Sequence, residues 1–110
     1  MAKRANQLFI EKEGQDYVIR MTPELQEDIG TVGFVEFSEE DQVEKDGLLA
    51  NLEASKTVLE LPSPLAGKIT ERHEAVVSQP ELLNSVKPEE NWIVKLTQVD
   101  EAAYEALEDA

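Results

Sequence analysis

The residues from Leu48 to Gly67 constrain the fold most, because their alternation fits a tight hairpin that turns at Ser55-Lys56. In such a hairpin, directly opposed residues share one face of the sheet. One face then carries apolar side chains, namely Ala50, Leu52, Leu59 and Leu61. The other face is mainly polar and carries Asn51, Glu53, Val58 and Glu60. A slip of one residue would mix the two sets, so the pattern predicts an antiparallel hairpin with Lys56 at its tip.

The turn itself lacks the residues that two-residue hairpin turns favour. Such turns prefer glycine or asparagine because one or both residues adopt φ > 0. A lysine in that conformation costs about 1 kcal/mol relative to glycine, so we expect a strained turn at Lys56. Taken alone, Lys56 is most simply interpreted as a solubilising surface lysine, and only its surroundings argue for another role.

Short strands separated by turns make up most of the remaining chain. Residues 8–12 and 17–21 read as a strand pair, and a short helix follows with Thr22 as its N-cap and Gly30 at its end. Residues 31–37 read as a strand, and we expect its apolar side chains to enter the core, namely those of Val32, Phe34 and Val35. Many short strands with little helix favour a mainly β fold, either a small sandwich or a barrel.

The ends and the acidic loop carry weaker patterns. Residues 1–6 have no periodicity and are expected to fray. In the tail, residues 98–110, Asp100 can cap a helix over Glu101–Leu107 with Ala103, Tyr104 and Leu107 on one side, and its acidic end should fray. Residues 38–47 form an acidic loop without Ca²⁺-loop spacing, so a solvated face is expected. His73, the only histidine, has no catalytic or metal partner at recognisable spacing.

Composition bounds the partners and the compartment. A chain of 110 residues is expected to form a single domain, residues 1–110. Its formal net charge of −14 disfavours nucleic acid and anionic membrane surfaces as partners. No long apolar run or leader-like start is present, so we expect a cytoplasmic protein. Because nothing in the sequence suggests a dimer interface, we expect a monomer. Without cysteine there is no disulfide and no thiolate ligand, and any redox-active sulfur must come from an attached group.

Four stretches form an ordered set of motifs over roughly residues 8–97. They are Glu53-Ala54-Ser55-Lys56-Thr57 with Glu60 and Pro64-Leu65-Ala66-Gly67-Lys68-Ile69 after it, Ile29-Gly30-Thr31-Val32-Gly33-Phe34-Val35-Glu36-Phe37, Pro80-Glu81-Leu82-Leu83-Asn84, and Trp92-Ile93-Val94-Lys95-Leu96. This set resembles the glycine cleavage system H-protein family, in the family's order and near its spacing. Four ordered motifs outweigh the interpretation of Lys56 as an ordinary surface lysine.

The resemblance implies a barrel-sandwich hybrid fold and a lipoyl carrier rather than an enzyme. Lipoic acid would be joined by an amide bond to Lys56, which would be loaded by a lipoate-attaching ligase or transferase. Glu53, Ala54, Ser55 and Thr57 would complete the attachment motif, and Glu60 would contact the arm. An ordinary lysine amine is protonated at neutral pH, so acylation by another enzyme fits better than Schiff-base catalysis. Thr57 stands where biotinyl domains have methionine, which leaves biotin as a minor option.

Departures from the family weaken glycine cleavage but leave lipoylation intact. Asn6-Gln7-Leu8 aligns with a His-Glu-Trp stretch, so Gln7 replaces a carboxylate that helps to hold the loaded arm. Asn91-Trp92 replaces Gly-Trp, and the C-terminal part is shorter. We therefore favour an H-like carrier. It would shuttle an aminomethyl or other group together with electrons. Its clients would be either a lipoyl relay or sirtuin and macrodomain enzymes.

Two alternatives remain beside the H-like carrier. The first is an ordinary H protein that serves glycine decarboxylase, aminomethyltransferase and dihydrolipoamide dehydrogenase. The second belongs to another class, an unmodified acidic adaptor that kept the fold and lost the cofactor. Retention of Glu53, Lys56 and Glu60 together argues against the adaptor.

Overall fold

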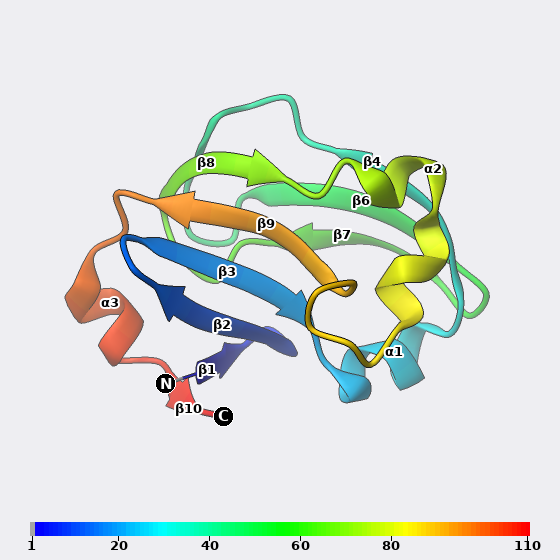
Figure 1. Ribbon diagram of the computed structural model, residues 1–110, viewed down its shortest axis with the longest axis horizontal. Helices are drawn as coiled ribbons and strands as arrows, with labels where there is room; N and C mark the ends of the chain where they lie inside the picture. Colours follow the sequence, from blue (N-terminus) through cyan, green and yellow to red (C-terminus); the bar gives the residue numbers. More distant parts are fainter. Residues whose placement is uncertain (1) are drawn as a thin grey trace.

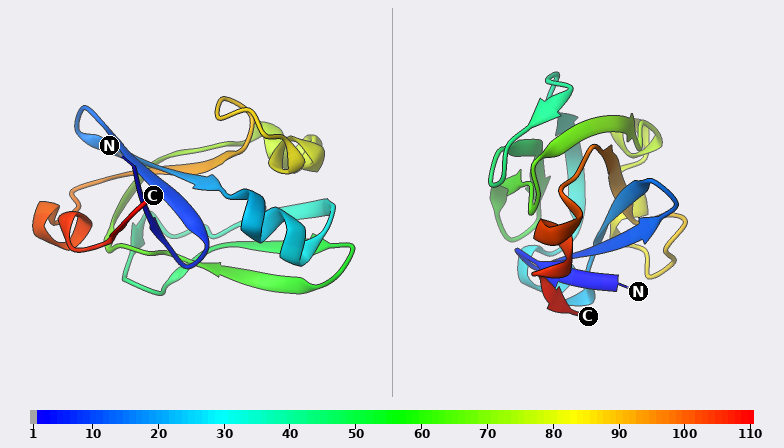
Figure 2. Two further views of the ribbon diagram at one scale, coloured as in Figure 1. Left: turned by 90° about the horizontal axis from the view of Figure 1, so that it is seen from below. Right: turned by 90° about the vertical axis from the view of Figure 1, so that its left-hand side faces the viewer.

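The computed structural model describes residues 2–110, which form two β-sheets packed as layers (Figures 1 and 2). Over that range the larger sheet has seven strands in the order β10-β1-β2-β3-β9-β8-β5, and the smaller has three in the order β4-β6-β7. The strands are β1 (Ala2–Ala5), β2 (Leu8–Glu13), β3 (Asp16–Met21), β4 (Val32–Phe37), β5 (Gln42–Val43), β6 (Leu48–Ala54), β7 (Val58–Pro62), β8 (Gly67–Arg72), β9 (Trp92–Thr97) and β10 (Glu108–Asp109). The helices are α1 (Pro23–Ile29), α2 (Ala75–Ser78), the 3₁₀ helix η1 (Pro80–Asn84) and α3 (Glu101–Glu105).

The hairpin β6–β7 has the register that the apolar alternation predicts. Leu52 lies opposite Leu59, and Glu53 lies opposite Val58. Leu52 is fully buried and Leu59 is half-buried, whereas Glu53 and Val58 are exposed. The apolar face of this hairpin therefore forms one wall of the core, and the predicted register and facing are confirmed.

Helix α1 begins and ends at the predicted residues. The hydroxyl of Thr22 accepts a hydrogen bond from the N–H of Leu25 at 3.1 Å, and Pro23 occupies the first turn. Leu25 and Ile29 bury the apolar side of the helix in the core. Gly30 ends the helix at φ +79°, and its N–H donates to the carbonyl of Gln26 at 3.0 Å.

The N-terminal segment is ordered in a strand, so the predicted fraying of residues 1–6 is wrong for residues 2–5, whereas Met1 lies outside the described residues. Strand β1 pairs with β2 and also with β10, where Lys3 lies opposite Asp109. The Nζ of Lys3 donates to the carboxylate of Asp109 at 2.7 Å. This hydrogen bond raises the pKa of the Lys3 amine above its ordinary value.

The C-terminal tail is likewise held in place rather than frayed. Asp100 caps α3 as predicted, and Tyr104 is buried against the core, but Ala103 is exposed, and the helix ends at Glu105 rather than at Leu107. The chain then continues into β10, which the sequence did not predict. Two residues of strand give no periodicity of their own, and pairing with β1 alone defines them.

A β-bulge in β4 overturns one core prediction. Val32 lies opposite Ala54 and Phe34 lies opposite Glu53, so Gly33 is the extra residue on the bulged strand. The alternation shifts at this point: Val32 and Val35 are buried, whereas Phe34 is 45% exposed. Phe34 therefore belongs to the outer face of the smaller sheet.

Two further elements were not predicted. The acidic loop over residues 38–47 contains β5, which pairs with β8 and buries Val43. Helix α2 follows β8 and buries Val76. Within residues 2–110, no helix is both long and apolar enough to span a membrane.

Candidate functional site: the Lys56 turn

Lys56 lies at the exposed tip of the β6–β7 hairpin, one residue after Ser55. The N–H of Ala54 donates to the carbonyl of Thr57 at 2.9 Å and closes the two-residue turn. Ser55, Lys56 and Thr57 are all exposed, and Ala54 is half-buried. Another protein can therefore reach the amine without moving any core element.

The turn rests against the segment that follows α1. The N–H of Ser55 donates to the carbonyl of Thr31 at 2.9 Å, and its hydroxyl accepts from the N–H of Thr31 at the same distance. The N–H of Lys56 donates to the carbonyl of Ile29, also at 2.9 Å. Three hydrogen bonds from outside the hairpin thus fix the turn.

These contacts explain why the predicted strain at the turn is wrong. Neither Ser55 nor Lys56 has positive φ; within residues 2–110 the non-glycine residues with positive φ are Asn6, Gln7, Asp46 and Gln98. The expectation treated the hairpin as isolated, with its geometry set only by strand twist. Bonds to Ile29 and Thr31 instead stabilise a turn with negative φ at both central residues.

Gly30 makes this close approach possible. A Cβ on Gly30 would collide with the Oγ of Ser55 and would lie 3.1 Å from the Cγ of Lys56. Its φ of +79° also lies in the region that side chains disfavour. The sequence marked Gly30 only as a helix stop, and its position within the Ile29-Gly30-Thr31 stretch was the available signal for a second role.

The side chain of Lys56 extends toward the C-terminal end of α1. Its Nζ donates to the carbonyl of Glu27 at 2.9 Å. The last carbonyls of a helix carry partial negative charge, which favours an ammonium group there. The unmodified amine therefore has a defined resting contact on the surface.

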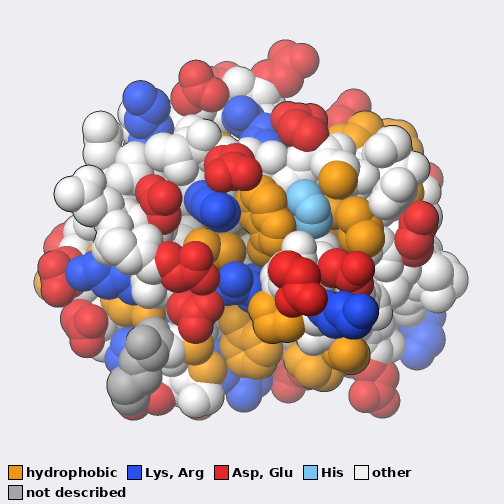
Figure 3. Space-filling view, viewed as in Figure 1, with side chains coloured by type: hydrophobic (Ala, Val, Ile, Leu, Met, Phe, Trp, Pro, Cys, Tyr) orange, Lys and Arg blue, Asp and Glu red, His pale blue; other side chains and the backbone are white. Residues whose placement is uncertain are grey.

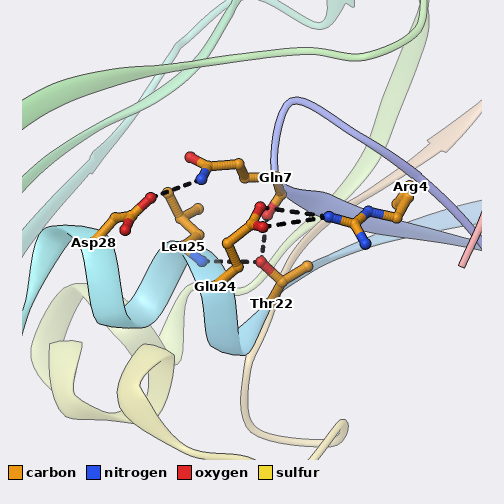
Figure 4. A network of polar contacts seen from close by, with 6 residues as sticks. All are labelled: Arg4, Gln7, Thr22, Glu24, Leu25 and Asp28. Carbon is orange, nitrogen blue, oxygen red and sulfur yellow. Dashed lines mark hydrogen bonds and ion pairs between the residues drawn. The ribbon is translucent and has the colours of Figure 1, made fainter.

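Gln7, which the resemblance predicts to replace a carboxylate, contacts Asp28, the residue of α1 that follows Glu27. The amide of Gln7 donates from Nε2 to the carboxylate of Asp28 at 2.7 Å, and Asp28 follows Glu27 on α1 (Figure 4). The carbonyl of Gln7 accepts from the hydroxyl of Thr22 at 2.6 Å. The amide of Gln7 thus binds a carboxylate of α1, a contact that no local pattern predicts.

The predicted acidic residues face away from this contact. Glu53 and Glu60 lie on the outer face of the smaller sheet, in register with Val58 and Asn51 respectively. The bare amine of Lys56 instead contacts α1. The structure therefore brings Ala54, Ser55, Lys56 and Thr57 together in one turn and leaves Glu53 and Glu60 on the adjacent sheet face.

The Pro80–Asn84 stretch forms hydrogen bonds with the elements that border the turn. The Nε2 of Gln26 on α1 donates to the carbonyls of Leu83 and Ser85, each at 2.8 Å. The Oδ1 of Asn84 accepts from the N–H of Val32 on β4 at 2.9 Å. Together these bonds tie α1 and β4, the two elements that border the turn, to η1.

The contacts of His73 are those of a residue with a structural role. Its ring stacks on Trp92 with centroids 4.3 Å apart, and its Nδ1 lies 2.7 Å from the Trp92 carbonyl oxygen. In the described part of the chain, no three histidine, aspartate or glutamate side chains are grouped so that they could hold a metal ion.

Comparisons with known proteins find relatives over most or all of the chain. Residues 2–110 match the glycine cleavage H-protein family. A glycine cleavage system H-like protein of Staphylococcus aureus strain Mu50 is 53% identical over 110 residues, which is the full length of both chains. A glycine cleavage system H protein of Listeria innocua is 36% identical over 100 residues, which cover 90% of this chain and 80% of that relative.

A solved structure supports the fold separately. The crystal structure of a glycine cleavage system H protein from Mycobacterium marinum has a TM-score of 0.74 and 21% identity, and covers 87% of this chain and 81% of that chain. The predicted mainly β, lipoyl-domain-like fold with short helices, one of them near the C-terminus, is thereby confirmed. The match over residues 2–110 and the extent of both sequence relatives lead to one conclusion: the chain belongs to the glycine cleavage H-protein family.

Proposed function

We propose that this protein is an H-like lipoyl carrier in which an amide bond joins lipoic acid to Lys56. Proteins of the glycine cleavage H family carry covalently attached lipoate and act as carriers rather than as enzymes. The observation that carries the proposal is the exposed lysine at the tip of a hairpin whose turn is fixed by Ile29 and Thr31. Such a turn presents an amine at a defined place, which a modifying enzyme requires.

The residues around Lys56 fit an acylated arm. Amide formation removes the lysine charge but leaves an N–H at the same atom. That N–H can still donate to the carbonyl of Glu27, the present partner of the amine. A lipoyl group supplies a disulfide that accepts a carried group and electrons, while the protein contributes position and docking surface.

The partners follow from this role. A lipoate-attaching ligase or transferase would load Lys56. As an H-like protein, the chain would then serve a lipoyl relay or sirtuin and macrodomain enzymes. In the ordinary version it would serve glycine decarboxylase, aminomethyltransferase and dihydrolipoamide dehydrogenase. Full-length similarity to an H-like protein and the replacement of a family carboxylate by Gln7 favour the H-like version.

The first test is the intact mass of the protein isolated from its native cells. We expect a lipoyl-sized increment that disappears in Lys56→Arg and persists in Lys45→Arg, a matched change at another exposed lysine. A bare mass, in cells that lipoylate other proteins, would refute the carrier and favour the unmodified adaptor.

A second test separates the two carrier versions. The lipoylated protein is supplied with glycine, glycine decarboxylase and aminomethyltransferase, and aminomethyl transfer is measured. We expect little transfer, and restoration of a carboxylate by Gln7→Glu, combined with Asp28→Asn so that two carboxylates do not face each other, should increase it. Transfer by the unchanged protein at the rate of an ordinary H protein would establish the ordinary version.

A further inference from the structure

Phe34 is an exposed phenylalanine on β4, close to the Lys56 turn. It lies in the row of Glu53 and Val58, the first residue pair beyond Ala54 and Thr57, which close the turn. The bulge at Gly33 turns Phe34 to the outer face of the smaller sheet, where it is 45% exposed. Phe34 lies opposite Glu53, and Glu53 lies opposite Val58, which is 72% exposed. Two large apolar side chains therefore flank a carboxylate in one row across the sheet.

The neighbouring positions on this face add negative charge. Glu36 lies opposite Asn51, which lies opposite Glu60, and both glutamates are exposed. We call the outward side chains of these two rows the tip patch: Phe34, Glu53, Val58, Glu36, Asn51 and Glu60. Within residues 2–110, no lysine or arginine forms an ion pair with its three carboxylates. The patch thus offers uncompensated negative charge around apolar groups.

A groove continues the tip patch toward α2. Its volume is about 590 Å³, and Phe34 on β4 and Val77 on α2 are two of its apolar lining residues. Val77 is 50% exposed. Glu39 and Glu74 also line the groove, and its one lining cation, Arg72, donates to the carbonyls of Ser38 and Glu40 and is paired with Asp41. The groove therefore suits an apolar side chain presented by a basic surface.

Distance from the amine indicates which partner uses this surface. The row of Phe34 crosses β6 at Glu53, three residues before Lys56, so it lies at most roughly 10 Å along the chain from the lysine. An enzyme that acylates the bare amine must bring its donor to Nζ, and a footprint of ordinary size around the Lys56 turn reaches this row. An enzyme that acts on the end of a long arm need not approach the hairpin so closely.

We propose that the tip patch and its groove are the docking surface for the lipoate-attaching enzyme. This inference rests on the proposed function of Lys56. The complementary surface of that enzyme carries lysine or arginine side chains opposite Glu36, Glu53 and Glu60, and an apolar residue that contacts Phe34. Charge sets the rate of encounter, and the apolar contact holds the amine in place for acylation.

Steady-state lipoylation of the purified unmodified protein by the lipoate-attaching enzyme of its native cells tests this assignment, with mass as the readout. Phe34→Ser should lower kcat/KM by about tenfold through a higher KM. Phe34→Leu should retain most of the rate, and Val86→Ser, a change at a side chain 80% exposed on the loop before β9, should have no effect. Because Phe34 lies outside the core, Phe34→Leu and Val86→Ser should keep the thermal midpoint of the unchanged protein, and Phe34→Ser should lower it by only a few degrees, so all three stay folded in the assay.

Charge is tested with the same assay. NaCl should raise KM for the unchanged protein, and less steeply for Glu36→Gln than for the matched Glu89→Gln. Equal kcat/KM for Phe34→Ser and the unchanged protein would overturn the docking surface and leave the carrier intact. Normal lipoylation of Phe34→Ser combined with lost client activity would assign the surface to a client instead. An unchanged protein that acquires no acyl group would refute the proposed function itself.

Discussion

Gly30 couples the end of α1 to the position of Lys56. The absence of a side chain lets the turn approach closely enough for Lys56 to donate its N–H to Ile29. The same glycine supplies the positive φ with which α1 ends. Gly30 thus both ends α1 and leaves the space that the Lys56 turn occupies.

Gly30→Ala should destabilise the protein more than Gly14→Ala. Both glycines have positive φ, at +79° and +64°, which costs alanine about 1–2 kcal/mol. A Cβ at Gly14 meets no atom within 4 Å, whereas at Gly30 it meets Ser55 and Lys56, which should add about 1–3 kcal/mol. Urea unfolding measures the difference, and lipoylation should slow only in Gly30→Ala. Equal losses of unfolding free energy would show that the turn adapts freely.

At the residue scale, the sequence predicted what depends on neighbours along the hairpin. Alternation of Leu52, Leu59 and Leu61 with polar residues determines the register, and hence that Lys56 is at the tip. The backbone conformation of Lys56 and the contact of its amine with Glu27 depend on α1, which lies more than twenty residues earlier. No local pattern contains that information.

Among the elements, η1 protects an otherwise unpaired edge of the smaller sheet. Strand β4 pairs with β6 on one side only. On the other side, the Oδ1 of Asn84 accepts from the N–H of Val32 at 2.9 Å, and its Nδ2 lies 3.5 Å from the Val32 carbonyl. An amide side chain thereby takes the place of a neighbouring strand at the first residue of β4.

Asn84→Ala should lower the free energy of unfolding by about 1–3 kcal/mol, because it leaves the buried N–H of Val32 without an acceptor. Asn84→Asp keeps an acceptor oxygen and should cost less. Urea unfolding gives the energies, and hydrogen exchange at the Val32 amide gives the local cause. Unchanged protection of that amide in Asn84→Ala would refute this role.

The elements that the sequence missed are those defined by distant partners. Residues 2–5 show no alternation, yet they form β1 because β2 lies on one side and β10 on the other. Phe34 was assigned to the core with its apolar neighbours Val32 and Val35, and a one-residue bulge at Gly33 places it on the outer face instead. By contrast, α1 carries its own cap at Thr22 and its own stop at Gly30, and it was predicted correctly.

The whole molecule is strongly acidic, with 24 aspartate and glutamate residues against 10 lysine and arginine residues. Acidic side chains are spread over the face shown in Figure 3 rather than gathered in one patch. Like charges at this density repel one another in the folded state, and screening weakens the repulsion within a Debye length.

Added NaCl should therefore raise the thermal midpoint. Screening that contributes on the order of 1 kcal/mol corresponds to an increase of roughly 4 °C for a domain of this size. Differential scanning calorimetry at neutral pH measures the midpoint, and sodium chloride is preferred to sulfate because sulfate also strengthens apolar burial. A midpoint that falls with NaCl would mean that the surface ion pairs outweigh the repulsion.

The pairing of β1 with β10 brings the two ends of the described chain together. The N–H of Ala110 donates to the carbonyl of Ala2 at 3.2 Å, and both ends lie opposite the Lys56 turn along the 36 Å axis (Figure 1). A short linker could therefore join the ends, and new ends could be opened between Glu44 and Lys45, two exposed residues that follow β5. Such a circular permutant would keep Lys56 in its place, because the packing of α1 beneath the turn, and not the order of strands along the chain, positions the lysine.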